Sequence, residues 1–160
     1  MRLTRSLALL APFVFAGCLD GTETEPIARI PIDCETLATS LVASEPTLTT
    51  TTSGLKYRDQ VVGTGTTVTA GRGVAVRYSG CLTNGTKFDE ADNTESPLVF
   101  TVNATPKQVI AGFDEGVIGM KVGGRRQLVI PPSLGYGATA NGPIPANSTL
   151  VFTVDAVAAQ

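Results

Sequence analysis

The side chains that stand out as candidates for a functional site are mostly aromatic, with one carboxylate among them. The 160 residues include no His, so the commonest general base and metal ligand is missing, and hydrolase sites of the Ser-His or Cys-His kind are excluded. Phe88 stands directly before Asp89, and Tyr136 lies between two glycines. Each of these residues also has a purely structural interpretation, as a core aromatic, a solvated turn carboxylate or a loop aromatic. Any reaction at this set must proceed without an imidazole.

The composition predicts one globular domain with some additional sequence. Hydrophobic residues make up 42% of the chain and charged residues 16%, which is enough apolar material for a core. The formal net charge is −2, and no run of five or more basic residues occurs. We therefore expect no nucleic-acid partner.

The N-terminus is typical of a bacterial export signal. Two arginines precede an apolar stretch at residues 7–15, which is too short to span a bilayer. Small residues then precede Cys18, a pattern that resembles the lipobox of bacterial lipoproteins. The resemblance implies a signal peptide at residues 1–17 and a lipidated Cys18, and Leu19 resembles an outer-membrane address, facing the periplasm. An ordinary signal peptide with an incidental Cys and a short membrane anchor are the alternatives.

Two further cysteines, Cys34 and Cys81, remain after the expected cleavage. Two thiols in an exported chain favour one disulfide, because the compartment is oxidising. Such a bond would fasten the N-terminal extension to the domain. The alternative is two unpaired thiols, one of which would behave as a small buried hydrophobe.

Residues 18–53 are expected to form a tether between the lipid and the domain. Residues 19–32 are mainly polar and acidic. Asp33 could cap a short helix that ends before Pro46, because two leucines follow it at i, i+4 spacing. The Thr-rich run at residues 47–53 is expected to be an extended linker.

Residues 54–160 have the pattern of an α+β domain. Val74, Val76 and Tyr78 alternate with other residues, as in a half-buried strand, and the pair at 84–85, Asn-Gly, is a strong turn signal. Further strands are expected at residues 98–102, 127–130 and 150–157. Helical signal is concentrated at residues 111–118, with Gly119 as a C-terminal cap. The strands must therefore form a sheet that covers this short helix.

Several segments of this domain resemble a known family in the family's own order. They are Gly54-Leu55-Lys56-Tyr57, Gly63-Thr64-Gly65, Val76-Arg77-Tyr78-Ser79-Gly80, Asn84-Gly85-Thr86-Lys87-Phe88-Asp89, Val109-Ile110-Ala111-Gly112-Phe113-Asp114-Glu115-Gly116, Met120-Lys121-Val122-Gly123-Gly124, Ile130-Pro131-Pro132, Tyr136-Gly137-Ala138, Ile144-Pro145 and Leu150-Val151-Phe152. The family is that of the FKBP-type peptidyl-prolyl cis/trans isomerases. The resemblance covers about two-thirds of the chain and implies a curved antiparallel β-sheet wrapped around one short α-helix.

The activity that this resemblance implies needs no nucleophile, metal or cofactor. A prolyl bond isomerises over tens to hundreds of seconds because its C–N bond has partial double-bond character. An enzyme has to favour the twisted imide over the planar one. A dry, aromatic-walled pocket would do so, because twisting reduces charge separation in the imide.

By the same resemblance, the family's prolyl pocket falls on named positions of this chain. They are Tyr78, Phe88, Asp89, Phe100, Val109, Ile110, Phe113, Tyr136, Ile144 and Phe152. Phe88, Phe100 and Phe152 would wall the proline ring, with Phe113 at the floor. The Ile110 N–H and the Tyr136 hydroxyl would bind substrate carbonyls. Asp89 would orient the imide region through a hydrogen bond with Tyr78, and not as a proton-transfer base.

Three departures from the family pattern bear on ligand preference. Phe113 stands where Trp is typical, Leu98 replaces a common aromatic at the rim, and the loop at residues 138–143 is about one residue shorter. These changes predict an active isomerase with altered substrate preference and weaker binding of macrolide inhibitors of the tacrolimus and rapamycin type.

The sequence thus predicts a monomeric isomerase that acts on Xaa-Pro bonds of exported proteins and assists their folding in the bacterial envelope. Its partners would be proline-containing polypeptides and the membrane. Two alternatives remain. One is a lipid-tethered chaperone or binding module for proline-containing segments with little turnover, and the other is a structural role at the envelope surface.

Overall fold

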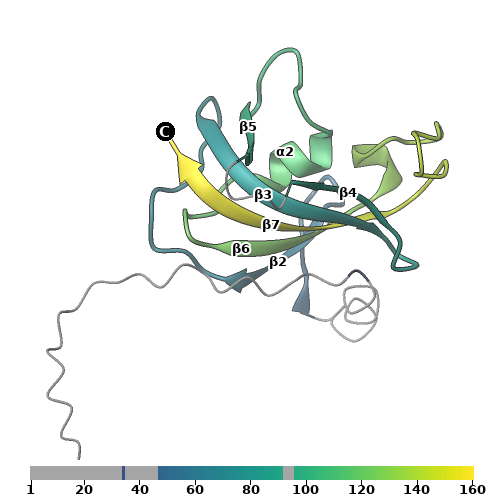
Figure 1. Ribbon diagram of the computed structural model, residues 1–160, viewed down its shortest axis with the longest axis horizontal. Coiled ribbons are helices and arrows are strands. Elements are labelled where there is room, and N and C mark those ends of the chain that lie inside the picture. The colour runs from purple at the N-terminus through teal and green to yellow at the C-terminus, as the bar shows by residue number, and fades with distance from the viewer. Residues whose placement is uncertain (1–33, 35–46, 92–95) are drawn as a thin grey trace, which may run out of the picture.

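The computed structural model describes residues 34, 47–91 and 96–160, and shows a curved antiparallel sheet wrapped around a short helix (Figure 1). The sheet contains β1 (Thr49–Thr50), β2 (Lys56–Val61), β3 (Gly73–Leu82), β4 (Lys87–Ala91), β5 (Leu98–Thr101), β6 (Arg125–Ile130) and β7 (Leu150–Ala159). The helix is α2 (Ala111–Val117), and a 3₁₀ turn follows β6 at Pro132–Leu134. The predicted α+β class, with a curved antiparallel sheet around one short helix, is confirmed.

Strand β3 organises the sheet because it has three partners. The strand order is β1-β2-β6-β7-β3-β4, and β5 also pairs with β3. One edge of β3 pairs with β7 along its whole length, while the other edge is shared. Its first half, from Gly73 to Val76, pairs with β5, and its second half, from Tyr78 to Cys81, pairs with β4. Side chains from β4 and β5 are thereby brought next to the same stretch of β3.

Helix α2 packs closely on the sheet because it presents glycines to it. Gly112 and Gly116 are four residues apart and so lie on one face of the helix. A Cβ at Gly112 would lie 2.4 Å from Ile130 Cγ2, and one at Gly116 would lie 2.6 Å from Leu128 Cδ1. The helix therefore sits nearer to β6 than a helix with side chains at these positions could. Leu128 and Ile130 are fully buried beneath it.

The far end of α2 is held by Arg126, which lies on β6. Its Nη1 donates to the carbonyl oxygens of Gly116 and Ile118, at 3.0 and 2.9 Å. Its Nε and Nη2 donate to the two carboxylate oxygens of Asp59 on β2, at 2.6 and 3.1 Å. Gly119, the predicted C-terminal cap, has a φ of +79°, as expected for a residue just past a helix end.

The folded unit begins earlier than the predicted boundary at residue 54. Thr49 and Thr50 form β1 and pair with β2, and the Ser53 hydroxyl donates to both carboxylate oxygens of Glu115 at 2.9 and 2.8 Å. Residues 49–53 thus belong to the sheet and its contacts with α2, and are not a free linker. The signal segment, Cys18 and the helix expected after Asp33 lie outside the described residues. No helix in the described part of the chain is long and apolar enough to cross a membrane.

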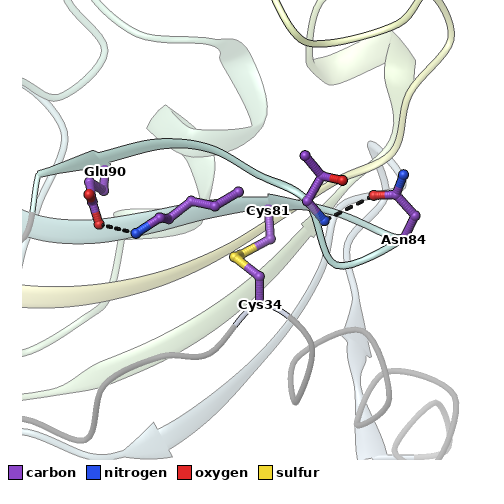
Figure 2. Close-up of a disulfide and its surroundings, with 6 residues drawn as sticks. Cys34, Cys81, Asn84 and Glu90 are labelled. Atoms are coloured by element: carbon purple, nitrogen blue, oxygen red, sulfur yellow. Dashed lines mark hydrogen bonds and ion pairs between the residues drawn. A yellow bond between two sulfur atoms is a disulfide. The ribbon is translucent and has the colours of Figure 1, made fainter.

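A disulfide joins Cys34 to Cys81, close to the turn between β3 and β4 that contains Asn84 (Figure 2). The two Cα atoms are 5.7 Å apart and the bonded residues are 47 positions apart in sequence. Cys34 and Cys81 are both buried and pack against Val151 and Val129. The bond therefore attaches the N-terminal extension to the sheet on the face opposite α2.

Candidate active site

A cavity of about 220 Å³ opens between β3, β4, the start of α2 and the loop that follows β6. Its walls are formed by Tyr78, Phe88, Asp89, Leu98, Gln108, Val109, Ile110, Phe113, Tyr136 and Phe152. The structure therefore brings together eight of the ten predicted pocket residues, which come from segments far apart in the sequence.

The floor of the cavity is an aromatic cluster centred on Phe113. This residue lies in the first turn of α2 and is 3% exposed. Its ring centroid is 5.2 Å from that of Phe152 and 5.4 Å from that of Tyr78, both in edge-to-face geometry. Edge-to-face pairs are a favourable arrangement for aromatic rings, so the floor is well packed and apolar.

The width of the cavity depends on a glycine. Phe88 and Phe152 meet edge to face with centroids 5.4 Å apart, on the β4 and β7 sides of β3. Gly80 lies under both rings, and a Cβ there would be 2.8 Å from Phe152 Cε1 and 2.9 Å from Phe88. Any side chain at this position would push one or both rings out of place.

The polar side of the cavity is a hydrogen-bonded pair, Tyr78 and Asp89. The Tyr78 hydroxyl donates to Asp89 Oδ2 at 2.7 Å, and the Glu90 backbone N–H donates to Oδ1 at 2.9 Å. The pairing of β3 with β4 places Asp89 opposite Gly80, one strand away from Tyr78. Burial, together with the Asp89 carboxylate, raises the pKa of Tyr78 well above its ordinary value of 10, so the hydroxyl stays protonated and remains a donor. The predicted hydrogen bond between these two residues is confirmed.

The rim carries groups that could bind a peptide backbone. Ile110 is the N-cap of α2 in an extended conformation, so its N–H belongs to the helix start and has no intrahelical acceptor. Tyr136 is 38% exposed and lines the cavity. The two donors predicted to bind substrate carbonyls therefore both border the cavity.

Gln108 is a cavity residue that sequence reasoning missed. Its side-chain oxygen accepts a hydrogen bond of 2.7 Å from the backbone N–H of Thr101, on the edge of β5. This bond fastens the loop that carries Val109 and Ile110 to the sheet. A lone Gln in a loop has no distinctive pattern, so no signal in the sequence identified it.

Two predicted pocket residues, Phe100 and Ile144, do not line the cavity. Leu98 and Phe100 share one face of β5, but Phe100 pairs opposite Val74 while Leu98 pairs opposite Val76, nearer to Tyr78. Leu98 therefore reaches the cavity, and Phe100 packs behind Phe113 with its centroid 6.0 Å away. The prediction that Phe100 forms a wall was wrong, because Leu98, two residues earlier on the same strand, lines the cavity instead.

Ile144, the second of these residues, lies in the hydrophobic core. It is 4% exposed and joins the main hydrophobic cluster of the domain. Its backbone N–H and C=O both bond to Asn141 at 2.9 Å, which closes a tight turn in the loop. The buried side chain of Ile144 therefore attaches this turn to the core.

The arrangement suits the binding of a small apolar ring beside a polar group. The cavity offers aromatic walls, one fixed carboxylate–hydroxyl pair and backbone donors at its rim. Within the part of the chain that the structure describes, no group of three or more His, Cys, Asp or Glu residues could hold a metal ion.

Comparison with known proteins identifies the family. The family model of FKBP-type peptidyl-prolyl cis-trans isomerase matches residues 64–157. An FK506-binding protein of Neisseria meningitidis is 46% identical over 103 residues, which is 64% of this chain and 93% of the relative. FK506-binding protein 4 of Chaetomium thermophilum is 50% identical over 101 residues, but the match spans only 20% of that longer protein.

A solved structure extends the likeness to three dimensions. The crystal structure of FkpA from Escherichia coli superposes with a TM-score of 0.66 at 35% identity, over 80% of this chain and 60% of that one. The family model covers more than half of the chain, and one relative is matched over nearly its whole length. Both results agree with the fold and the cavity. The chain belongs to the FKBP-type peptidyl-prolyl cis-trans isomerase family.

Proposed function

We propose that this protein catalyses cis/trans isomerisation of Xaa-Pro bonds in exported proteins and so assists their folding in the bacterial envelope. The observation that carries the proposal is the Tyr78–Asp89 pair beside an aromatic cavity of about 220 Å³. An apolar ring of the size of proline fits such a cavity. The Tyr78–Asp89 pair on the wall of the same cavity would then lie next to the polar imide.

The mechanism follows from what the cavity offers to the two states of the imide. The planar imide is stabilised by resonance that separates charge, and the twisted imide has lost that resonance. Walls formed by Phe88, Phe113 and Phe152 stabilise the less polar twisted state relative to the planar state. The Ile110 N–H and the Tyr136 hydroxyl hold the flanking carbonyls, so that rotation about the C–N bond is confined to one side of the proline. No covalent bond forms or breaks.

Asp89 is the residue whose loss should affect turnover most clearly. Asp89→Ala in the purified full chain should lower kcat/KM for an Xaa-Pro peptide with apolar Xaa by about 10- to 100-fold, the usual effect of removing a charged hydrogen-bond partner. The measurement is the cis-to-trans rate in a coupled or NMR assay, with a macrolide pocket ligand as the block. A folded wild-type protein without acceleration would contradict isomerase activity, and would leave a binding module for proline-containing segments as the function.

The envelope location rests on Cys18 and the sequence before it. We propose that Cys18 carries acyl chains that hold the protein on the outer membrane, because small residues and Cys follow a short apolar stretch. Cys18→Ala expressed in a bacterial host should then move the protein from the membrane fraction to the soluble fraction. Equal membrane association of both forms would show that Cys18 is not the anchor.

Macrolide ligands of the tacrolimus type are proposed to bind the same cavity, with reduced affinity. Phe113 and Leu98 present smaller surfaces than the aromatic residues typical of the family at those positions. The affinity of apolar ligands falls with the apolar area that is buried.

A further inference from the structure

The loop between β5 and α2 carries three of the residues that line the cavity, Gln108, Val109 and Ile110. From residue 102 to residue 110 it contains turns and bends but no strand or helix. A loop of this kind lacks the ladder of backbone hydrogen bonds that fixes a strand, so side-chain contacts have to hold it in one conformation. The conformation of the loop determines where the backbone donor of Ile110 lies at the cavity rim.

Asp114, in the first turn of α2, makes two of these contacts. Its side chain is 2% exposed, and it directly follows Phe113 at the floor of the cavity. Asp114 Oδ1 accepts a hydrogen bond of 2.9 Å from the backbone N–H of Asn103, and Oδ2 accepts one of 2.5 Å from Lys107 Nζ. Hydrogen bonds to an ionised group are roughly twice as strong as neutral ones. Asp114 therefore ties the helix to two points of the loop.

Lys107 and Asn103 form a closed set of contacts with Asp114. Lys107 Nζ also donates to Asn103 Oδ1 at 2.9 Å, so each of the three residues bonds to the other two. Asn103 has a φ of +59°, in the left-handed region that Asn adopts more readily than most residues. The Lys107 side chain is 51% exposed, so it can be replaced without disturbing the core.

Gln108 holds the same loop at a further point, through the 2.7 Å hydrogen bond that its side-chain oxygen accepts from the Thr101 N–H. Ile110 lies two residues further along the chain. The N–H of Asp114 donates to the carbonyl oxygen of Ile110 at 3.1 Å. Asp114 thus contacts the loop near its start, through Asn103, and at its end, through Ile110.

We infer that Asp114 is a positioning residue for substrate binding. It does not line the cavity itself, and it acts through Asn103 and Lys107, which hold the loop so that the Ile110 N–H lies at the rim. The inference rests on the proposed function, in which this N–H binds a substrate carbonyl. If the loop adopts the binding-competent conformation for only a fraction of the time, the apparent Kd rises in inverse proportion to that fraction. Loss of Asp114 should thus weaken substrate binding and leave the twisting of the imide nearly unchanged.

Two measurements on the purified full chain test this inference, with one Xaa-Pro peptide whose Xaa is apolar. They are the Kd of the peptide from an NMR titration, and kcat and KM separately from the cis-to-trans rate. Asp114→Ala should raise Kd and KM by about tenfold, as expected if about one molecule in ten keeps the competent loop, and should change kcat by less than about twofold. A purely structural role would instead lower the apparent kcat at unchanged KM, because fewer molecules would be active.

Three further variants separate the contacts. Asp114→Asn retains an acceptor for the Asn103 N–H, and should bring Kd and KM to within about threefold of wild type, the effect of losing one partly exposed ion pair. Lys107→Met removes the cation alone and should raise both values by about threefold. Glu115→Ala is the matched control, because Glu115 is the next residue of α2 and its carboxylate bonds to Ser53 near β1 instead of the loop. It should leave Kd and KM unchanged.

Unchanged Kd and KM in folded Asp114→Ala would overturn the inference, and so would a fall in kcat at unchanged KM. If Asp114→Ala does not fold, Lys107→Met decides by the same criterion. A wild-type protein that binds the peptide without turnover would contradict the isomerase function, while the ratio of Kd values would still decide the role of Asp114. A wild-type protein that neither binds nor isomerises the peptide would overturn both, because no substrate carbonyl would then meet Ile110.

Discussion

At the scale of single residues, the shape of the cavity depends on a position without a side chain. Gly80 points toward the rings of Phe88 and Phe152, and there is no room for even a methyl group between them. The residue has an ordinary strand conformation, so its role is steric and does not concern backbone freedom. Gly80 therefore determines the positions of the Phe88 and Phe152 rings in the cavity wall.

Gly80→Ala should therefore reduce activity while leaving the fold intact. We expect a loss in kcat/KM of about tenfold or more, because displaced rings narrow the space for proline and small misplacements in a site have large kinetic costs. Gly73→Ala on the same strand is the control, since a Cβ there would meet nothing within 4 Å. Equal activity of the two variants, measured with the same peptide, would show that the rings adjust freely.

The sequence predicted most of the residues that line the cavity, but not which residue of β5 reaches it. Leu98 and Phe100 differ by two positions, so alternation places both on one face of a strand. Which of them reaches the cavity depends on the register between β5 and β3, and that register is a tertiary property. Gln108 accepts a hydrogen bond from the backbone N–H of Thr101. A single polar residue in a loop has no sequence pattern that predicts such a bond.

At the scale of elements, Arg126 joins three parts of the fold. It pairs with Asp59 on β2, binds the last carbonyls of α2, and its guanidinium lies 4.5 Å from the centre of the Tyr57 ring. These contacts hold the end of the seven-residue helix against the sheet. Helices this short are not stable alone, so their ends depend on such contacts.

Arg126→Ala should lower the free energy of unfolding by about 2–4 kcal/mol, because it leaves helix carbonyls and Asp59 without their donor. Chemical denaturation of the two proteins measures the difference. Arg72→Ala, at an exposed arginine, is the control and should change stability by less than about 0.5 kcal/mol. A similar small change at Arg126 would mean that water replaces its hydrogen bonds without cost.

The elements themselves were largely predictable. The alternation at residues 74–78, the turn at Asn84-Gly85 and the helix at 111–118 all appear in the structure. Strand β1 was missed because two threonines carry no periodicity and become a strand only by pairing with β2. Short edge strands of this kind depend on their partner and not on their own sequence.

At the scale of the whole molecule, the disulfide closes a loop of 47 residues that includes β1, β2 and most of β3. A cross-link over such a separation stabilises mainly by restricting the unfolded chain, with an expected contribution of about 2–4 kcal/mol. Cys34→Ser should thus lower the free energy of unfolding by that amount. Thermal or urea unfolding of wild-type and variant protein measures it. Equal stability would indicate that the reduced chain is already compact when unfolded.

The position of this bond would also limit how far the domain can move from a membrane to which Cys18 is anchored. Neighbouring residues on a strand face opposite sides, so Cys81 lies behind the wall that Gly80 helps to form. If acyl chains hold Cys18, the first attachment to the domain is at Cys34, 16 residues further along the chain, and not at β1. Sixteen residues reach at most about 50–60 Å even when fully extended. The domain would then stay within that distance of the lipid. Under this proposal, substrate chains would be bound near the bilayer surface.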